Sequence, residues 1–357
     1  MNEEPTEEIR TDLIEEESAA KSPSKRGVFR VAEMAGVSIA TVSRTFNDPQ
    51  RVRKDVRTRV LEAATAAGYV PNSAAKALRL QRTRVIGAVI PTLDHAIYAK
   101  LVNGMQARLA DDGYTVIVLS VGFDNSNVFE AVRRIVERGA EALMMVGRVV
   151  DEKLRHFLET KQIPFVQTYS FVPGSDELSV GIDNFSAMRD IVDHLLDLGH
   201  TNLTMIAGPT AGNDRQISRR AAFQDSLKKR GITVPRPIIE KTYRFESGIQ
   251  ALKEIRDFFP ETTAIICSSD ILAFGVLHAC RLARIDVPSD ISVTGFDDLD
   301  FAQYLWPPLT TVAIRSEEMG RIAAERIVAI LDGDTVQSEC LATQLIVRSS
   351  TGRAPVR

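Results

Sequence analysis

Cysteine is scarce in this 357-residue chain, which has three cysteines and no Cys-x-x-Cys spacing. This scarcity argues against a disulfide framework or a cysteine-based zinc site, and it favours buried thiols in a reducing compartment. The five histidines lack metal-ligand spacing, and the motifs of nucleotide-binding loops, serine hydrolases and zinc proteases are missing. We therefore expect that the protein is not an enzyme and that it needs no metal and no cofactor.

Long apolar runs are also missing, so no segment of the sequence is expected to cross a membrane. The chain starts MNEEPTEEIRTDLIEEE, with acidic residues where a secretion signal has a basic segment and an apolar core. We expect a cytoplasmic protein without a membrane partner. With 44% apolar and 25% charged residues, the composition is ordinary for a globular protein of two or three domains.

Charge is distributed unevenly behind a formal net charge of −3. Residues 1–20 carry a net charge of −7, whereas residues 21–84 hold fourteen Lys and Arg against four acids, a net charge of +10. Such a localised excess is typical of a phosphate-binding surface. Residues 1–26 have too few large apolar side chains to offset the entropy of ordering, so we predict a disordered acidic tail there.

The basic region contains the pattern of a helix-turn-helix. A short helix over 29–35 would be followed by a turn at Gly36, and Ser38 can cap a second helix. On this second helix, Val42 and Phe46 are spaced to pack inward. The residues left free to face a DNA groove are Ile39, Ala40, Ser43, Arg44 and Asn47. Taken alone, the stretch is also compatible with an ordinary helical hairpin that carries one surface arginine.

A third helical pattern covers residues 54–67 and ends at Gly68, so the three helices predict one small domain. Pro71 breaks this pattern. The short, alanine-rich and basic segment 73–80 that follows is only a marginal helix on its own, because helix nucleation is costly.

From residue 85 onward, short strand-like apolar runs alternate with longer segments of helical periodicity. The runs fall into two successive groups: 85–91, 115–120, 142–147 and 164–170, and then 178–184, 202–208, 238–243, 264–270 and 291–297. Two groups of βα units predict two doubly wound lobes with parallel sheets and right-handed crossovers. Ligands of such folds bind beyond the carboxyl ends of the strands, so a cleft between the lobes is the expected site.

The cluster GFDDLD places Asp297, Asp298 and Asp300 directly after a strand and is the most enzyme-like feature of the sequence. Paired carboxylates can carry out acid-base chemistry or bind a metal. At the end of a parallel strand they are equally suited to bind sugar hydroxyls or to cap the next segment.

Several motifs follow one another along residues 28–350: VAEMAGVSIATVSRTFN, GYVPNSAAKALR, IGAVIP, VGIDN, LLDLGH, RRAAFQDSL, SSDILAFG, DISVTGFDD and PPLTTV. Together they resemble the lactose/galactose repressor family of bacterial transcription regulators. VGIDNFSAM also resembles the gluconate-repressor branch of that family. The resemblance implies a small all-α helix-turn-helix DNA-binding domain joined to an α/β core of two doubly wound lobes, like that of periplasmic binding proteins.

This resemblance divides the chain into four parts. They are the tail 1–26, a helix-turn-helix domain 27–71, a hinge helix and linker 72–84, and an effector-binding and dimerisation core 85–357. The amino-terminal lobe of the core would contain about 85–185 and 314–343, and the carboxyl-terminal lobe about 186–313 and 344–357.

The resemblance also assigns DNA contacts. Arg44 is the best candidate for direct readout, because an arginine there can form a bidentate pair with guanine. Ile39 and Ala40 are apolar where many relatives are polar, which suggests contact with thymine methyls and leaves the operator sequence open. Leu78 matches the residue that wedges into the minor groove, or it is a core leucine that docks the linker. The implied DNA-binding set is Ser38, Ile39, Ala40, Thr41, Ser43, Arg44, Asn47, Arg53, Tyr69, Asn72, Ala75, Lys76 and Leu78.

A small-molecule effector, a sugar, sugar acid or sugar phosphate, is implied for the cleft. Arg219 would bind an anionic or hydroxylated group and Asp297 a pair of hydroxyls. Ser269 stands where relatives often have Asn, which leaves the identity of the effector open. The other implied effector contacts are Tyr98, Tyr169, Asp183 and Tyr243.

The expected function is repression of carbohydrate or sugar-acid (gluconate-like) utilisation genes. Two copies would bind near-palindromic double-stranded operator DNA, and an effector, more readily an inducer than a co-repressor, would change that affinity. The carboxyl end lacks leucine heptads, so we predict a homodimer rather than a tetramer. The alternative is a sugar-binding protein of a transport system without DNA function, which would need a signal peptide and no basic reader.

Overall fold

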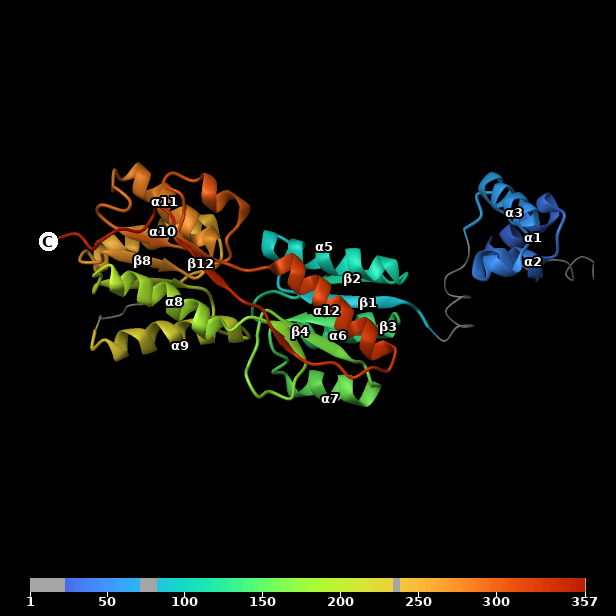
Figure 1. The fold of residues 1–357 in the computed structure, drawn as a ribbon, viewed down its shortest axis with the longest axis horizontal. Coiled ribbons are helices and arrows are strands. Elements are labelled where there is room, and N and C mark those ends of the chain that lie inside the picture. The colour runs from blue at the N-terminus through green and yellow to red at the C-terminus, as the bar shows by residue number, and fades with distance from the viewer. Residues whose placement is uncertain (1–22, 71–81, 234–237, 357) are drawn as a thin grey trace, which may run out of the picture. The chain divides into compact units, whose positions relative to one another are not determined.

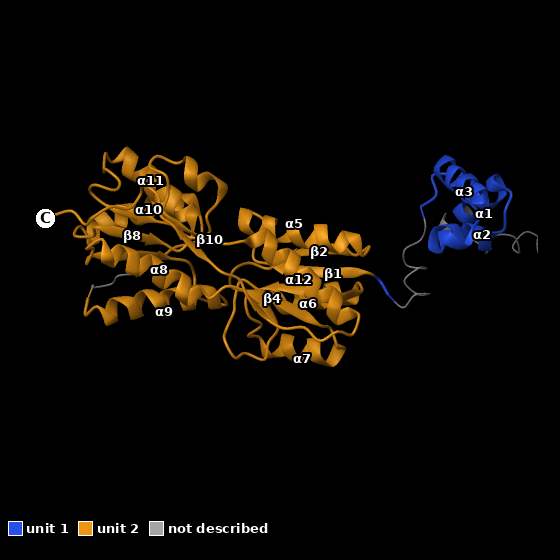
Figure 2. Ribbon diagram, viewed as in Figure 1, with its two compact units in different colours: residues 1–83 blue, residues 84–357 orange. Residues whose placement is uncertain are grey.

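The computed structural model describes residues 23–70, 82–233 and 238–356, which form two compact units, residues 1–83 and 84–357 (Figure 2). The division falls in the segment for which the sequence predicts a hinge. Most of the predicted tail and the hinge residues Asn72, Ala75, Lys76 and Leu78 lie outside the described residues, so the hinge helix stays a prediction.

Unit 1 is a small all-helical body. Its elements are α1 (Pro23–Ala35), α2 (Ile39–Asn47), the short 3-10 helix η1 (Pro49–Arg51) and α3 (Lys54–Ala66). Its core is made of small and β-branched side chains, namely Val31, Ala32, Ala35, Val42, Val60, Ala63 and Ala64. Phe46, predicted to point inward, is half-buried, and Thr45 takes the second buried position of α2 instead.

The first helix starts earlier than predicted. It begins at Pro23, six residues before the expected start at Phe29, so the boundary predicted for the tail at residue 26 is too late. A proline is favoured at the first helical position because its fixed φ already suits the helix. The prediction failed because it relied on apolar spacing, which is missing from the polar first turn.

The amino-terminal lobe of unit 2 is built on a six-stranded parallel sheet of order β11-β5-β4-β3-β1-β2. The strands are β1 (Val85–Ile90), β2 (Thr115–Ser120), β3 (Ala140–Val146), β4 (Phe165–Thr168), β5 (Ser179–Gly181) and β11 (Glu339–Cys340). Helices cover both faces, as Figure 1 shows. They are α5 (Ala96–Asp111) and α12 (Ser316–Leu331) on one face, and α6 (Val128–Glu137) and α7 (Glu152–Lys161) on the other.

The carboxyl-terminal lobe has a four-stranded parallel sheet of order β7-β6-β8-β9. Its strands are β6 (Leu203–Ala207), β7 (Ile238–Glu240), β8 (Ala264–Cys267) and β9 (Ser292–Thr294). Two helices pack together on each face: α8 (Asn184–Asp197) with α9 (Asp214–Lys229), and α10 (Phe245–Phe258) with α11 (Asp270–Leu282). The two-lobed α/β fold class predicted from the sequence is confirmed.

Some short elements were not predicted. These are the 3-10 helix η2 (Asp300–Tyr304), the antiparallel pair β10 (Thr311–Ala313) with β12 (Gln344–Ile346), and β11. Strands of two or three residues carry too little alternation to be recognised from the sequence. They matter because the chain passes between the lobes beside them, through segments 182–183, 314–315 and 341–343.

The two helices on one face of the amino-terminal lobe approach each other closely. A Cβ atom on Gly104 of α5 would lie 2.0 Å from the backbone oxygen of Glu317, and one on Gly320 of α12 would lie 1.9 Å from that of Leu101. Only glycine fits at these two positions, and each helix places its backbone against the other.

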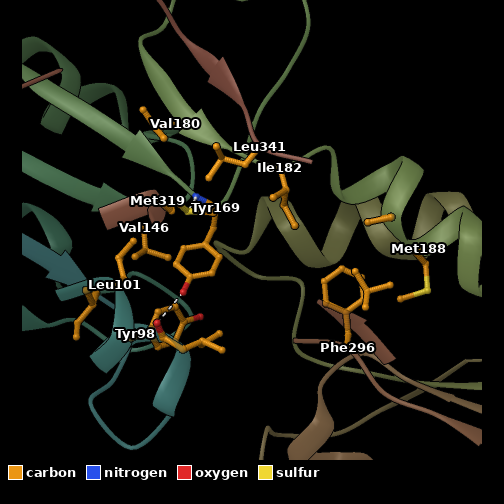
Figure 3. Close-up of a cluster of buried hydrophobic side chains, with 14 of the residues drawn as sticks. Tyr98, Leu101, Val146, Tyr169, Val180, Ile182, Met188, Phe296, Met319 and Leu341 are labelled. Atoms are coloured by element: carbon orange, nitrogen blue, oxygen red, sulfur yellow. Dashed lines mark hydrogen bonds between the residues drawn. The ribbon is translucent and has the colours of Figure 1, made fainter. Parts of the chain in front are cut away.

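The largest apolar cluster contains buried side chains of both lobes (Figure 3). In the amino-terminal lobe it includes Tyr98, Tyr169 and Met319, and in the carboxyl-terminal lobe Met188 and Phe296. Tyr98 and Tyr169 stand edge to face with ring centres 5.5 Å apart. Buried apolar side chains of the two lobes therefore form one continuous cluster.

Candidate functional site

The second helix of unit 1 presents a mixed surface. The predicted cap is confirmed: the Ser38 hydroxyl accepts a hydrogen bond from the Thr41 amide at 3.2 Å. Val42 is fully buried, whereas Ile39, with 38% of its surface exposed, Ala40 and Arg44 lie on the outer side.

Polar side chains of this helix largely pair with each other. The Ser38 and Thr41 hydroxyls lie 2.9 Å apart, and the Asn47 amide donates to the Ser43 carbonyl at 2.7 Å and to its hydroxyl at 3.2 Å. The groups that α2 leaves without such pairing on its outer side are the apolar Ile39 and Ala40 and the Arg44 guanidinium.

Two other predicted DNA contacts lie among the described residues of unit 1. Arg53 is exposed and forms an ion pair with Asp55 at 3.2 Å. Tyr69 packs edge-on against Phe46 with ring centres 5.9 Å apart, and burial raises the pKa of its hydroxyl. Tyr69 is therefore a protonated, partly buried donor at neutral pH.

In unit 2, a small cavity lies between the lobes. Its wall contains residues of the amino-terminal lobe, namely His95, Ile97, Tyr98, Phe123 and Tyr169. The carboxyl-terminal lobe adds Asn213, Arg215, Arg219, Tyr243, Ser268, Ser269 and Asp297. Wider hollows occur beside α7 and α11, but the charged side chains lining those two are exposed or half-buried. The cavity between the lobes is distinguished by its buried charges.

Arg219 comes from α9 and is held on two sides. Its Nε donates to Asn184 Oδ1 and its Nη1 to the Ser268 carbonyl, both at 2.9 Å. The guanidinium carbon also lies 3.6 Å from the centre of the Phe296 ring, which is a cation–π contact. Burial lowers the pKa of Arg219 and the Asp297 carboxylate raises it, but an arginine stays charged in proteins. The charge is thus fixed in place before any ligand binds.

Asp297 follows β9 and faces the same cavity. The Ser269 hydroxyl donates to its Oδ2 at 3.1 Å. Burial raises the pKa of Asp297 to about 7, against the opposing effects of Arg219 and Ser269. The hydrogen bonds of Arg219 and Asp297 go to other partners rather than to each other, so both groups are available to one ligand.

The three tyrosines predicted to touch an effector all line this cavity, and the hydroxyls of two of them, Tyr169 and Tyr243, already have partners. Tyr169 lies 2.8 Å from the Ile97 carbonyl and 2.9 Å from the Ser316 hydroxyl, and Tyr243 donates to Gln216 Oε1 at 2.8 Å. Burial raises the pKa of Tyr98, Tyr169 and Tyr243, so all three are neutral. Their rings contribute mainly walls to the cavity.

Asp183 was predicted to contact the effector, and the structure places it at the start of α8. Its carboxylate caps α8 by accepting from the Ser186 amide at 3.0 Å and the Ser186 hydroxyl at 2.7 Å. An aspartate directly before a helix satisfies the free amides of the first turn. Asp183 is not among the residues that line the cavity.

Sequence reasoning missed four prominent lining residues: His95, Phe123, Asn213 and Arg215. Arg215 is buried, and its Nη1 binds Asp214 Oδ1 at 2.9 Å. A signal for Arg215 was present, because it lies four residues before Arg219 and so on the same face of α9. His95 and Phe123 lie in loops, where no periodicity points to the cavity.

Contacts across the cavity hold the lobes together. His95 donates from Nε2 to the Tyr243 carbonyl at 3.0 Å, and Asn125 donates to the Gly212 carbonyl at 2.8 Å. Burial lowers the pKa of His95, which favours the neutral ring. The two lobes are therefore in direct contact beside the cavity.

No group of three or more potential ligands that would hold a metal ion occurs among the described residues. Within the same residues, no helix combines the length and the apolar character needed to span a bilayer.

Comparison with known proteins finds similarity in both units of the chain. Residues 30–72 match the model described as bacterial regulatory proteins, lacI family, and residues 192–351 match a periplasmic binding protein-like domain. The chain is 29% identical to the HTH-type transcriptional repressor CytR of Escherichia coli K12 over 342 residues, 94% of this chain and 99% of the relative. It is 26% identical to the HTH-type transcriptional regulator GntR of the same strain, over 89% of this chain and 96% of the relative.

A solved structure of the lac repressor dimer bound to operator and the anti-inducer ONPF is 26% identical. The match covers 90% of this chain and 98% of that chain, with a TM-score of 0.79. A helix-turn-helix unit and a two-lobed core of the periplasmic-binding type together define a DNA-binding transcription regulator. Its helix-turn-helix segment matches the lacI family of bacterial regulatory proteins, and nearly the whole chain is similar to CytR, GntR and the lac repressor.

The family resemblance predicted from the sequence is therefore confirmed. CytR and GntR are both named as transcription regulators, in line with a role other than catalysis. The match over residues 30–72 counts against a transport protein without DNA function. Similar identities to CytR and GntR leave the gluconate-repressor branch a prediction.

Proposed function

We propose that this regulator represses carbohydrate or sugar-acid utilisation genes, and that a sugar, sugar acid or sugar phosphate bound between its lobes controls its affinity for DNA. The observation that carries the proposal is the pair Arg219 and Asp297, two buried charges that face one cavity without binding each other. Buried polar groups in a binding site need matched partners. An oxygen-rich ligand supplies acceptors for the arginine and hydroxyl donors for the aspartate.

The walls of the cavity agree with such a ligand. The rings of Tyr98, Phe123 and Tyr243 present flat apolar faces, which suit the carbon-bound hydrogens of a sugar. Ser269 binds Asp297 and so fixes the direction of its carboxylate. Recognition would combine a few polar contacts with apolar walls.

Control of DNA binding would follow from the two lobes. A ligand that contacts both lobes stabilises the closed arrangement in which His95 meets Tyr243. Its effect on operator affinity equals the difference in its own affinity for the two DNA-binding states. We propose that this difference is transmitted through the hinge segment 72–84.

On the DNA side, Arg44 would form a bidentate pair with guanine, while Ile39 and Ala40 would contact thymine methyls. Leu78 would wedge into the minor groove at the centre of a near-palindromic operator bound by a homodimer. Support for the dimer comes from the lac repressor, which was solved as a dimer bound to operator.

The test has two stages. An operator is first selected from random duplexes, and its affinity is then measured with D-gluconate, D-ribose and D-glucose 6-phosphate, on wild type and on Arg219→Met. We expect at least one compound to change the affinity of the wild type by about tenfold or more and to leave Arg219→Met unchanged. If none of the compounds changes the wild type, the proposed effector class is wrong.

Assembly is tested separately by sedimentation of the full-length chain without DNA. A dimer is expected, and a stable tetramer would contradict the proposal.

A further inference from the structure

We propose that Asp270 is a positioning residue for the effector site: its buried carboxyl group holds the turn that presents Asp297, although Asp270 itself does not line the cavity. The inference rests on the proposed role of Asp297 in effector binding. Asp270 is the first residue of α11 and has no exposed surface.

The residues directly after Asp297 are connected to the Asp270 carboxyl group by hydrogen bonds. Its Oδ2 accepts from the Leu299 amide at 2.7 Å, and its Oδ1 accepts from the Thr311 hydroxyl, also at 2.7 Å. The Thr311 oxygen in turn accepts from the Asp298 amide at 3.4 Å. The two residues that follow Asp297 are thus tied to Asp270, one directly and one through Thr311.

On the other side, the Asp270 amide donates to the Phe296 carbonyl at 2.8 Å. Gly295 lies so close that a Cβ atom there would be 2.1 Å from Asp270 Oδ1. Asp270 therefore contacts the backbone immediately before Asp297 as well as the backbone immediately after it.

The turn needs such support because its backbone is strained. Asp297 has φ of 117° and Asp298 has φ of 51°, both in the left-handed region that residues with side chains avoid. Residues in such conformations are destabilising and persist only where their surroundings fix them. Without Asp270 and Thr311, the backbone would relax and carry the Asp297 carboxylate away from Ser269 and the cavity.

Neighbouring residues divide the task. Ser269 holds the carboxylate of Asp297 at 3.1 Å, and Asp270 holds the backbone on both sides of the same residue. Because both lie at the start of one helix, the direction of Asp297 is fixed to the rigid frame of α11. A buried carboxyl group is costly unless it is hydrogen-bonded, and here both of its oxygens have partners.

The test is amide hydrogen exchange of the full-length protein, followed in peptides that cover residues 295–302. Thr311→Val removes the hydroxyl that joins Asp270 to Asp298. Asp270→Ala removes the carboxyl group, and with it the bonds to both Leu299 and Thr311. Thr204→Val is the matched control, because Thr204 is also buried in this lobe and its hydroxyl binds Thr262 at 2.9 Å, but in β6 and away from the turn.

We expect exchange in residues 295–302 to become about tenfold faster in Thr311→Val, from the loss of one buried hydrogen bond, and to stay unchanged in Thr204→Val. Asp270→Ala should exceed Thr311→Val, and Thr311→Val decides the question alone if Asp270→Ala does not fold. Equal exchange in the turn of Thr311→Val and Thr204→Val would overturn the proposal.

The link to ligand binding is measured with D-gluconate by calorimetry. If wild type binds it, Thr311→Val should bind about tenfold more weakly and Thr204→Val equally well; equal binding by both variants would overturn the positioning role. If wild type does not bind D-gluconate, the proposal for that effector is contradicted, whereas the exchange experiment still decides whether Asp270 holds the turn.

Discussion

The candidate contact residues on the outer face of α2 and those in the cavity between the lobes are arranged in opposite ways. On α2 the candidate contacts lie within ten residues of sequence and their polar members pair with each other, which leaves Ile39, Ala40 and Arg44 outward. In the cavity, residues as distant as His95 and Asp297 converge, and the buried charges are held by partners from other elements.

This difference indicates which side chains must be fixed before a ligand binds. A surface that meets DNA can rely on the helix itself for geometry, because the partner supplies the rest of the order. A cavity that selects a small molecule must hold its charges before the ligand arrives, since buried groups without partners are costly. Substitutions should therefore cost more folding stability in the cavity than on α2.

The largest effect is expected at Arg219. Arg219→Met leaves Asn184 Oδ1 and the Ser268 carbonyl without their donor and should lower the free energy of unfolding by about 3 kcal/mol. Arg220→Met is the control, because Arg220 forms a partly exposed pair with Glu240 and should cost less than about 1 kcal/mol. Urea unfolding of the full chain measures both, and equal losses would break the contrast between cavity and surface.

The next largest effect is expected at Arg44, on the outer face of α2. Arg44→Ala should weaken operator binding by about 1–3 kcal/mol and relax the base preference, because a bidentate pair with guanine is lost. Stability should hardly change, since Arg44 is exposed. Lys76→Ala should instead weaken binding to all sequences alike and flatten the salt dependence. Fluorescence anisotropy with cognate and random duplexes separates these outcomes; unchanged operator affinity in Arg44→Ala would refute the proposed readout.

The pKa of Asp297 predicts how stability and effector affinity depend on pH. Its pKa of about 7 is above the ordinary value, so the protonated form is favoured in the fold. The resulting stabilisation is present at low pH and is lost as the pH rises through about 7. The carboxylate needed to accept effector hydroxyls appears over the same interval, so effector affinity should rise by up to about tenfold per pH unit below the pKa.

Calorimetric titration of the effector found in the screen, at several pH values, measures this effect. Asp297→Asn should bind weakly and with no pH dependence near neutrality. An affinity of the wild type that falls as the pH rises from about 6 to about 8 would contradict the role given to the carboxylate.

The smallest effect is expected at the cap of α2. Ser38→Ala removes the acceptor of the Thr41 amide and should destabilise unit 1 by about 1 kcal/mol. Ser38→Thr retains an acceptor and serves as the control. Amide exchange in α2 of the full chain reports the change, and equal protection in both variants would show that the cap is dispensable.

The two regions also differ in how far the sequence predicts them. The start of α2, its buried Val42 and its exposed Arg44 follow from spacing within one helix, so local rules suffice. In the cavity, Arg219, Ser269 and Asp297 came from family resemblance, and they do line one cavity. Asp183, also from the resemblance, caps α8 and is not among the lining residues; an aspartate before a helix can serve as a cap or as a ligand contact, and local sequence does not distinguish the two roles.

What the sequence hides are the contacts made by loops and by very short strands. His95 and Phe123 reach the cavity only because the lobes close against each other, and β10 and β12 pair across more than thirty residues of chain. Neither kind of contact leaves a periodic signal. The support that Asp270 gives to Asp297 is of the same kind, since it joins residues 27 positions apart.

The path of the chain between the lobes also sets an order for synthesis. The amino-terminal lobe contains β1–β5 but is completed by α12 and β11, which are encoded after the whole carboxyl-terminal parallel sheet. A nascent chain that has emerged only to residue 310 therefore exposes the face of the sheet that α12 covers, including the glycine-lined contact on α5. During synthesis, all strands of the carboxyl-terminal parallel sheet therefore emerge before α12 and β11 can complete the core of the amino-terminal lobe.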